Sequence, residues 1–196
     1  MLTRSLTRAA TALALALAPV TLGAQVAATG SPRLTVAASF GGLSGAADLN
    51  TAGTAQWDLG WAASVDATYS INRYLGVRAG GGWAQDSIRG QTLGGRGTFN
   101  KFTYDAGLVL RYPVELASGT FTPYVVGGGG AISLHQLGSD STWTKPAVNF
   151  GAGLEYRFGQ LGLRVEGRDF IYQFDRFGFD KTQHDIAWQG GVTVSF

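Results

Sequence analysis

Hydrophobic and polar residues alternate one by one along most of the chain. The longest unbroken run covers residues 56–71, where the odd positions are apolar or aromatic and the even positions are polar or small. Successive side chains of a β-strand point to opposite faces of the sheet, so this run predicts a strand with one apolar and one polar face. The same alternation recurs elsewhere and predicts eight strands: 34–40, 56–71, 75–83, 101–112, 124–135, 148–158, 161–168 and 186–196.

The length of these strands indicates a membrane protein. The longest has 16 residues, whereas strands of soluble sheets usually have about 5–6. A tilted strand needs roughly 9–11 residues to cross a bilayer. Strand length therefore favours a transmembrane barrel.

The composition of the second face indicates which face meets lipid. It consists of glycine, alanine, serine and threonine, mixed with charges of both signs. Such residues suit the lumen of an eight-stranded barrel, which is only just wide enough to be filled by side chains. We therefore expect the apolar face to contact lipid. The predicted fold is an all-β, eight-stranded, antiparallel, up-and-down transmembrane β-barrel.

The predicted connections alternate between long and short along the chain. Segments 41–55, 88–98, 136–146 and 171–184 are long, 72–74 and 159–160 are short, and 113–120 is intermediate. Outer-membrane barrels have long extracellular loops and short periplasmic turns. Both ends of the barrel domain should then lie on the periplasmic side.

Aromatic residues fall near both ends of the predicted strands, as expected for the two aromatic girdles of a membrane barrel. The predicted extracellular set is Trp57, Trp61, Trp83, Phe102, Tyr104, Phe150, Tyr172 and Trp188, and the predicted periplasmic set is Tyr69, Tyr112, Tyr124, Tyr156, Phe158 and Phe196.

Residues 1–28 have the pattern of a cleaved signal peptide, which leaves 29–196 as the barrel domain. Arg4 and Arg8 precede an uncharged, mostly apolar run, and small residues follow it. The chain has 15 basic and 13 acidic residues, so without these two arginines it is formally neutral. Nothing in its charge favours nucleic acid. The absence of cysteine excludes disulfides, thiolate metal sites and a cysteine nucleophile.

With this strand pattern the chain resembles the small outer-membrane barrels of the OmpA/OmpX type. The resemblance includes the last strand, where Gln189, Gly191 and Phe196 match the C-terminal signal for membrane insertion, while Val194 stands where an aromatic residue is commoner. It implies residence in the outer membrane, contact with outer-membrane lipid and lipopolysaccharide, and recognition by the outer-membrane insertion machinery.

Charged residues on the polar face are the first candidates for function. They are Asp58, Asp66, Arg78, Lys101, Asp105, Arg111, Glu155, Arg157, Arg164, Glu166 and Arg168. They could line an ion path, or they could form a structural network, because charges removed from water must be paired. The short turn at 159–160 would place Glu155 opposite Arg164.

The connection 171–184 is the second candidate, as a contact surface for an extracellular ligand. Tyr172, Phe174, Phe177 and Phe179 are interleaved there with charged residues, and clustered exposed aromatics often mark contact surfaces. The alternative is that these rings extend the strands and rest on lipid head groups.

The remaining polar chemistry is sparse. Ser133 and His135 are expected to face the lumen without an acidic third member, so they do not form a hydrolase site. No catalytic, metal or cofactor site is predicted. The favoured function is structural or surface-interacting, the first alternative is a small-solute pore, and the second is a lipid A-modifying enzyme.

Overall fold

The computed structural model describes residues 33–45, 55–90, 97–136, 142–174 and 181–196, and these form ten strands. They are β1 (Leu34–Gly45), β2 (Ala55–Trp57), β3 (Gly60–Ser70), β4 (Leu75–Gly90), β5 (Gly97–Arg111), β6 (Val114–Leu116), β7 (Gly119–Gln136), β8 (Thr142–Phe158), β9 (Leu161–Phe174) and β10 (Lys181–Ser195). In this part of the chain no helix is long and apolar enough to cross a membrane.

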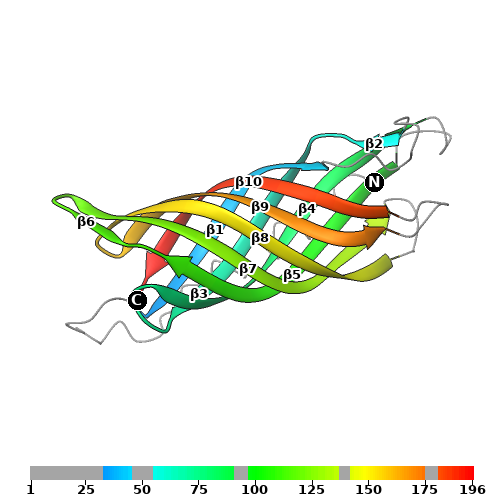
Figure 1. Ribbon diagram of the computed structural model, residues 1–196. Helices are drawn as coiled ribbons and strands as arrows, with labels where there is room; N and C mark the ends of the chain where they lie inside the picture. Colours follow the sequence, from blue (N-terminus) through cyan, green and yellow to red (C-terminus); the bar gives the residue numbers. More distant parts are fainter. Residues whose placement is uncertain (1–32, 46–54, 91–96, 137–141, 175–180) are drawn as a thin grey trace. The chain divides into compact units, whose positions relative to one another are not determined.

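The eight long strands close into one antiparallel barrel (Figure 1). Each pairs with its neighbours along the chain, and β1 pairs with β10 from Thr35 opposite Ser195 to Gly45 opposite Asp185. Of the two short strands, β2 lies just before β3 and pairs with β4, while β6 forms a hairpin with β7. The predicted eight-stranded barrel is confirmed.

One end of the barrel carries the short turns and the chain terminus. The Phe196 backbone exchanges hydrogen bonds with Leu34, so the last residue lies beside the start of β1. The two-residue turn between β8 and β9 uses Gly159 at φ 64°, a conformation that glycine adopts without strain. In an outer membrane this is the periplasmic end.

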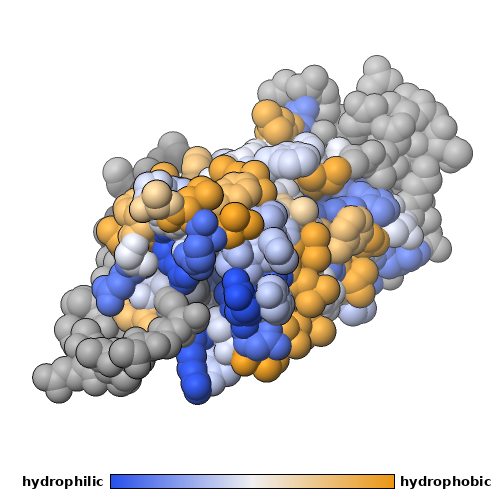
Figure 2. Space-filling model, turned by 60° about the vertical axis from the view of Figure 1, so that its left-hand side comes forward, coloured by the Kyte–Doolittle hydropathy of each residue, from blue (hydrophilic) through white to orange (hydrophobic). Residues whose placement is uncertain are grey.

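Alternation decides which side chains meet lipid in seven of the eight long strands. Val65, Leu108 and Val192 are exposed on the outer wall, whereas Asp66, Val109 and Thr193, each next in sequence, are buried in the lumen. In Figure 2 hydrophobic residues cover the sides of the barrel and hydrophilic residues gather towards its near, periplasmic end. The outer wall is therefore apolar.

The face assignment of β7 was wrong. Tyr124, Val126, Ile132 and Leu134 were expected on the lipid side but are buried in the lumen, and the residues between them face outward. Residues 125–131 are valine, glycine and alanine at odd and even positions alike. Hydrophobic contrast is too weak in such a segment to fix its phase.

The strands also extend further from the membrane than their apolar residues indicated. Residues 142–147, 169–174 and 181–185 were placed wholly or partly in connections, yet they are paired strand. Polar residues on the outer face of these extensions interrupt the hydrophobic alternation, which is why the extensions resembled loops.

An aromatic row crosses the outer wall towards the extracellular end. Phe40, Trp61, Trp83 and Phe102, from four neighbouring strands, follow one another with ring centroids 6.2, 4.7 and 6.3 Å apart. At the other end Tyr74 stacks on Tyr112, and Tyr156 lies beside Phe158. These two levels delimit the apolar band between them.

The Val65→Arg variant should measure how strictly this band excludes charge. Val65 is exposed on the outer wall of β3, and an arginine at the bilayer midplane of a barrel costs about 2–4 kcal/mol. Ser64→Ala, one residue away on the luminal side, is the matched control and should cost much less. Equal losses in denaturant titrations of the refolded barrel in vesicles would contradict the assigned face.

Candidate functional site

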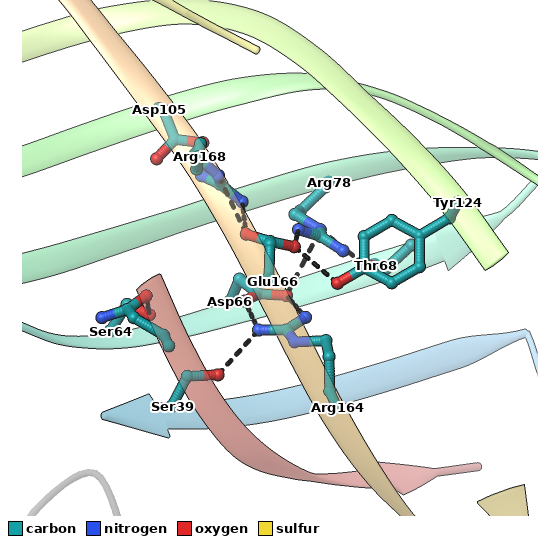
Figure 3. Close-up of polar contacts among 11 residues, drawn as sticks. Ser39, Ser64, Asp66, Thr68, Arg78, Asp105, Tyr124, Arg164, Glu166 and Arg168 are labelled. Atoms are coloured by element: carbon teal, nitrogen blue, oxygen red, sulfur yellow. Dashed lines mark hydrogen bonds and ion pairs between the residues drawn. The ribbon is translucent and has the colours of Figure 1, made fainter. Parts of the chain in front are cut away.

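Six charged side chains from four strands meet in the lumen between the barrel's two ends (Figure 3). The three arginines and three carboxylates alternate along a chain of contacts, in which Arg78 and Arg168 each lie between two carboxylates and Arg164 pairs with one. They are Asp66 on β3, Arg78 on β4, Asp105 on β5, and Arg164, Glu166 and Arg168 on β9. We call this group the central network.

Arg164 and Arg78 connect Asp66 to the rest of the central network. The Arg164 guanidinium donates to both carboxylate oxygens of Asp66 and to Ser39 Oγ at 3.0 Å. Arg78 Nη1 donates to Glu166 Oε2 at 2.6 Å, and its Nε lies 3.4 Å from Asp66. A guanidinium holds two carboxylates in this way because its donors form a rigid planar fork.

Glu166 lies at the centre of the network. It accepts hydrogen bonds from Arg78, from Arg168 and, at 2.6 Å, from the Tyr124 hydroxyl. Arg168 continues to Asp105, with 3.0 Å between Nη1 and Oδ1. Tyr124 fits because residue 153 is glycine, since a Cβ there would lie 2.3 Å from the hydroxyl.

Charge is balanced within the central network. Three cations face three anions, and all but Asp105 are buried, so each ion exchanges its water shell for ionic partners. Pairs of this kind fix geometry more than they add stability, while removal of one partner is costly. The arrangement therefore fills the lumen and links β3, β4, β5 and β9.

A second ionic cluster lies nearer the extracellular end, and of its charges the sequence indicated only Lys101 as luminal. Lys101 Nζ lies 2.8 Å from Asp86 and 2.7 Å from Asp185, and the Tyr172 hydroxyl donates to Asp185 at 3.1 Å. Lys101 is 1% exposed, Asp86 3% and Asp185 1%. Parity could have located it, because Asp86 is in phase with Arg78 on β4. We call it the upper cluster.

Buried apolar side chains form two clusters in the extracellular half of the lumen. Phe99, Ile132, Leu134, Ala147 and Tyr172 pack together with Trp143 against them. A second group consists of Leu43, Ala62, Ala84, Phe170 and Ala187.

A small cavity lies between the central network and the upper cluster. About 40 Å³ is open to water there, lined by Asp66, Asp105 and Arg168 on one side and Lys101 and Asp185 on the other. This is room for a few water molecules, since one needs about 10–15 Å³ by this measure.

The other predicted luminal charges stand apart from the central network. Glu155 is opposite Arg164 in the β8–β9 register, as expected, but Arg164 turns to Asp66 instead. Arg111 donates to the Asn72 carbonyl at the periplasmic turn. Arg157 is half-buried opposite Gly162, and Asp58 lies between β2 and β3.

Tyr172 does not belong to an exposed aromatic surface. It was expected on the outside of the extracellular connection, yet it is 3% exposed and lies in the lumen. Tyr124 was likewise expected in the periplasmic girdle and lies in the lumen. The backbone of Phe174 ends β9, while the Phe174 side chain and residues Phe177 and Phe179 lie outside the described residues.

Ser133 and His135 face outward, not into the lumen as expected. They pair across strands with Thr144 at 2.8 Å and Thr142 at 3.0 Å. Neither contacts a carboxylate among the described residues, so a hydrolase triad is not assembled there. The described residues also contain no group of three or more potential metal ligands among His, Cys, Asp and Glu.

The three residues of the expected insertion signal lie on β10 and at its end. Gln189 accepts a hydrogen bond from Ser64, Gly191 is opposite Ser39, and Phe196 is exposed beyond the strand. Gln189 and Gly191 thus contact neighbouring strands of the barrel, whereas the Phe196 ring is exposed on its surface.

Phe196→Ser should therefore impair insertion rather than folding. The ring is half-exposed, so its loss removes little packing from the barrel, while the expected insertion signal includes an aromatic residue at this position. We expect less folded, heat-modifiable protein in cells but unchanged refolding into vesicles in vitro. Equal loss in both assays would assign Phe196 a purely structural role.

Comparison with known proteins identifies the family. The model of the family described as "Outer membrane protein beta-barrel domain" matches residues 10–196. The chain belongs to this family. Its place is accordingly the outer membrane.

Solved structures show the same fold. Neisserial surface protein A has 18% identity and a TM-score of 0.64, over 85% of this chain and 99% of that one. The N-terminal β-barrel domain of Pseudomonas aeruginosa OprF has 15% identity and a TM-score of 0.50, over 85% and 100%. No curated protein matches the sequence. At these identities the likeness concerns the fold alone.

Proposed function

We propose that the protein is a closed outer-membrane barrel that works at its extracellular surface and does not conduct solutes. The observation that carries this proposal is the filling of the lumen. The central network occupies one level, the upper cluster and its apolar neighbours occupy the next, and about 40 Å³ remains open between them.

A small-solute pore would need a continuous water-filled path through the lumen. The central network and the upper cluster with its apolar neighbours both argue against such a path. Phe99, Ile132 and Leu134 are each 1% exposed, so water does not reach them from the extracellular side. Opening the central network would strand buried charges, which is costly. The pore therefore ranks below the closed barrel.

The outer faces of the strand extensions support a role in surface contact. Beyond the aromatic row, uncharged polar side chains form cross-strand pairs: Ser87 with Thr98 at 3.2 Å, Gln85 with Asn100 at 3.0 Å, and Ser133 with Thr144 at 2.8 Å. Their hydroxyl and amide groups suit hydrogen bonding to polar partners outside the membrane. Lipopolysaccharide and an extracellular ligand are the proposed partners, and the similar neisserial barrel is itself named a surface protein.

Planar-bilayer recording of the purified, refolded protein tests the closed lumen. We expect no unitary conductance from the parent under conditions in which a reconstituted porin control gives clear steps. Regular steps that depend on the amount of folded parent would overturn the closed barrel and favour the pore.

Cell attachment tests the surface role. Cells that display the parent should bind to coated surfaces better than cells carrying the combined Ser133→Ala, Thr142→Ala and Thr144→Ala variant. Heat-modifiability on gels must be equal in the two. Attachment equal to that of cells lacking the protein would contradict the surface role.

A further inference from the structure

A histidine–carboxylate pair lies on the outer wall towards the extracellular end, and neither a closed lumen nor polar surface contact accounts for it. His184 Nδ1 lies 2.7 Å from Asp169 Oδ2. The Asp169 side chain is 14% exposed and the His184 side chain 41%, so the pair is partly shielded but accessible. A carboxylate that holds an imidazole through Nδ1 is the orienting half of a catalytic triad. The third member of a triad is a hydroxyl next to Nε2.

A hydroxyl has the equivalent place on the other side of His184. Strand β10 pairs with β9 on one side and with β1 on the other, and Ile186 is opposite Asp169 in the first pair and opposite Ser44 in the second. Asp169 and Ser44 are therefore both diagonal neighbours of His184, displaced from it by the same two residues. Diagonal neighbours are about 7–8 Å apart and within reach of aromatic side chains. On the β9 side this diagonal is bridged at 2.7 Å.

The three side chains share one face of the barrel. Ser44 follows the buried Leu43, so its hydroxyl is on the outer face, where it is half-buried. The two ring nitrogens are on different edges of the imidazole. With Nδ1 on Asp169, Nε2 is therefore directed away from β9, and β1 is the next strand on that side. Ser44 and His184 are not hydrogen-bonded to each other here, but such catalytic hydrogen bonds often tighten only when substrate binds.

An apolar hollow leads from this pair into the membrane. It measures about 810 Å³, and its border includes Leu108, Gly127, Phe150, Asp169 and Ile186. These five residues are successive cross-strand partners from β5 to β10, and the next partner in the row is Ser44. Strands of such barrels tilt by about 35–45°, so the row descends from the extracellular end of β1 towards the periplasmic end of β5. An acyl chain lying in the hollow would end beside Ser44.

We propose that Ser44, His184 and Asp169 form a hydrolase site for esters of long acyl chains at the extracellular membrane surface. Ser44 is the nucleophile and His184 the general base, while Asp169 is a positioning residue for the imidazole. The acyl chain occupies the hollow, which places its ester carbonyl next to Ser44. The inference does not rest on the proposed surface role, because a closed lumen is compatible with chemistry on the outer wall.

The reaction consists of two balanced steps. Ser44 Oγ bonds to the ester carbonyl carbon and its proton passes to His184 Nε2; the bond from that carbon to the alcohol oxygen then breaks, and the alcohol leaves with the proton. Water next attacks the acyl-serine and gives a proton to Nε2. That proton returns to Ser44 Oγ as the carboxylic acid departs. Water is the only co-reactant.

Sequence patterns did not indicate this site. Ser44 and His184 were both expected in connections, 41–55 and 171–184, and connections have no register. Their common face follows only from the strand extensions that the structure shows.

Covalent labelling of the full, refolded barrel tests the nucleophile. A long-chain fluorophosphonate reacts with an activated serine, whose oxygen bonds to phosphorus while fluoride leaves. We expect peptide mass spectrometry to locate one label, on Ser44, and to find none after heat denaturation. A label on another residue, or no label on the folded barrel, would overturn the proposal.

Hydrolysis of 4-nitrophenyl decanoate in detergent micelles tests the activity. Ser44→Ala and His184→Gln should lower kcat at least about a hundredfold. Ser133→Ala and His135→Gln, the outward serine and histidine of β7, are the matched controls and should keep the parent rate. Asp169→Asn should lower kcat with little change in KM, because it orients the base without touching the ester. Parent-like rates in Ser44→Ala, or equal losses in both members of a matched pair with equal heat-modifiability, would contradict the assigned site.

Chain length tests the role of the hollow. The parent should have a higher kcat/KM for the decanoate than for the acetate ester. Gly127→Leu fills the hollow and is sterically allowed, because the nearest atom to its Cβ is the Asn149 carbonyl oxygen at 3.8 Å. It should abolish the preference and leave acetate hydrolysis unchanged, whereas Ala79→Leu on β4 should preserve both. A preference that survives Gly127→Leu would overturn the hollow as the acyl site.

The natural ester can belong to a phospholipid or to an acylated saccharide. Vesicles of diacyl phospholipid, with and without the acylated saccharide, distinguish these sources by the fatty acid that the parent releases. Release from neither would overturn the proposal.

Discussion

Lys101→Met is expected to lower the free energy of unfolding by about 3–5 kcal/mol, the usual cost of removing one partner from a buried ionic group. The Lys101 ammonium lies between the carboxylates of Asp86 and Asp185, all of them buried. Methionine preserves most of the volume but leaves two adjacent carboxylates without their cation. Denaturant titration of the refolded barrel in vesicles measures the loss.

Two further variants separate lost charge pairing from lost packing. The triple variant Lys101→Met, Asp86→Asn, Asp185→Asn removes the stranded charges and should recover most of the stability. Arg73→Met, in the exposed turn before β4, should change stability by no more than about 0.5 kcal/mol. A triple variant no more stable than Lys101→Met would show that charge is not the cause.

Alternation predicted the barrel because membrane insertion imposes one requirement on every strand: an apolar face towards lipid. The residues of β9 illustrate this, since Leu163 and Val165 are outside and Arg164 and Glu166 are inside. This requirement does not distinguish the two faces of a strand where the lumen is also apolar. In β7, Ile132 and Leu134 satisfy luminal packing against Phe99, and Gly127 and Gly129 satisfy the outer wall equally well.

The sequence predicted which charges share the lumen better than it predicted how they pair. Register relates only residues on adjacent strands, and it correctly placed Glu155 opposite Arg164. In a narrow barrel, long side chains also reach across the lumen, and Arg164 on β9 pairs with Asp66 on β3. Such pairs depend on barrel closure and side-chain length, which no local pattern encodes.

The two carboxylates of the upper cluster were missed for a different reason. Asp86 and Asp185 lie beyond the apolar centres of β4 and β10, where polar residues on both faces remove the hydrophobic contrast. Tyr172 was read as an exposed loop aromatic for the same reason. Extending each strand in phase from its apolar centre would have turned all three side chains inward.

The pairing of Arg164 gives a direct test of contact across the lumen against contact between neighbouring strands. Arg164→Gln should cost about 3 kcal/mol, the lower part of the range for a broken buried pair, because Arg78 remains near Asp66. Asp66→Asn should also be destabilising, since it leaves one arginine in excess.

The double variant Asp66→Asn, Arg164→Gln removes one charge of each sign and restores the balance of the central network. Its cost should therefore fall short of the summed single costs by about 1–3 kcal/mol, as for residues in direct contact. Glu155→Gln serves as the matched variant on the adjacent strand. Combined with Arg164→Gln it should give nearly additive costs, because Arg164 is turned towards Asp66 and Ser39. Strong coupling to Glu155 together with additivity at Asp66 would mean that the arginine points along the sheet instead of across the lumen.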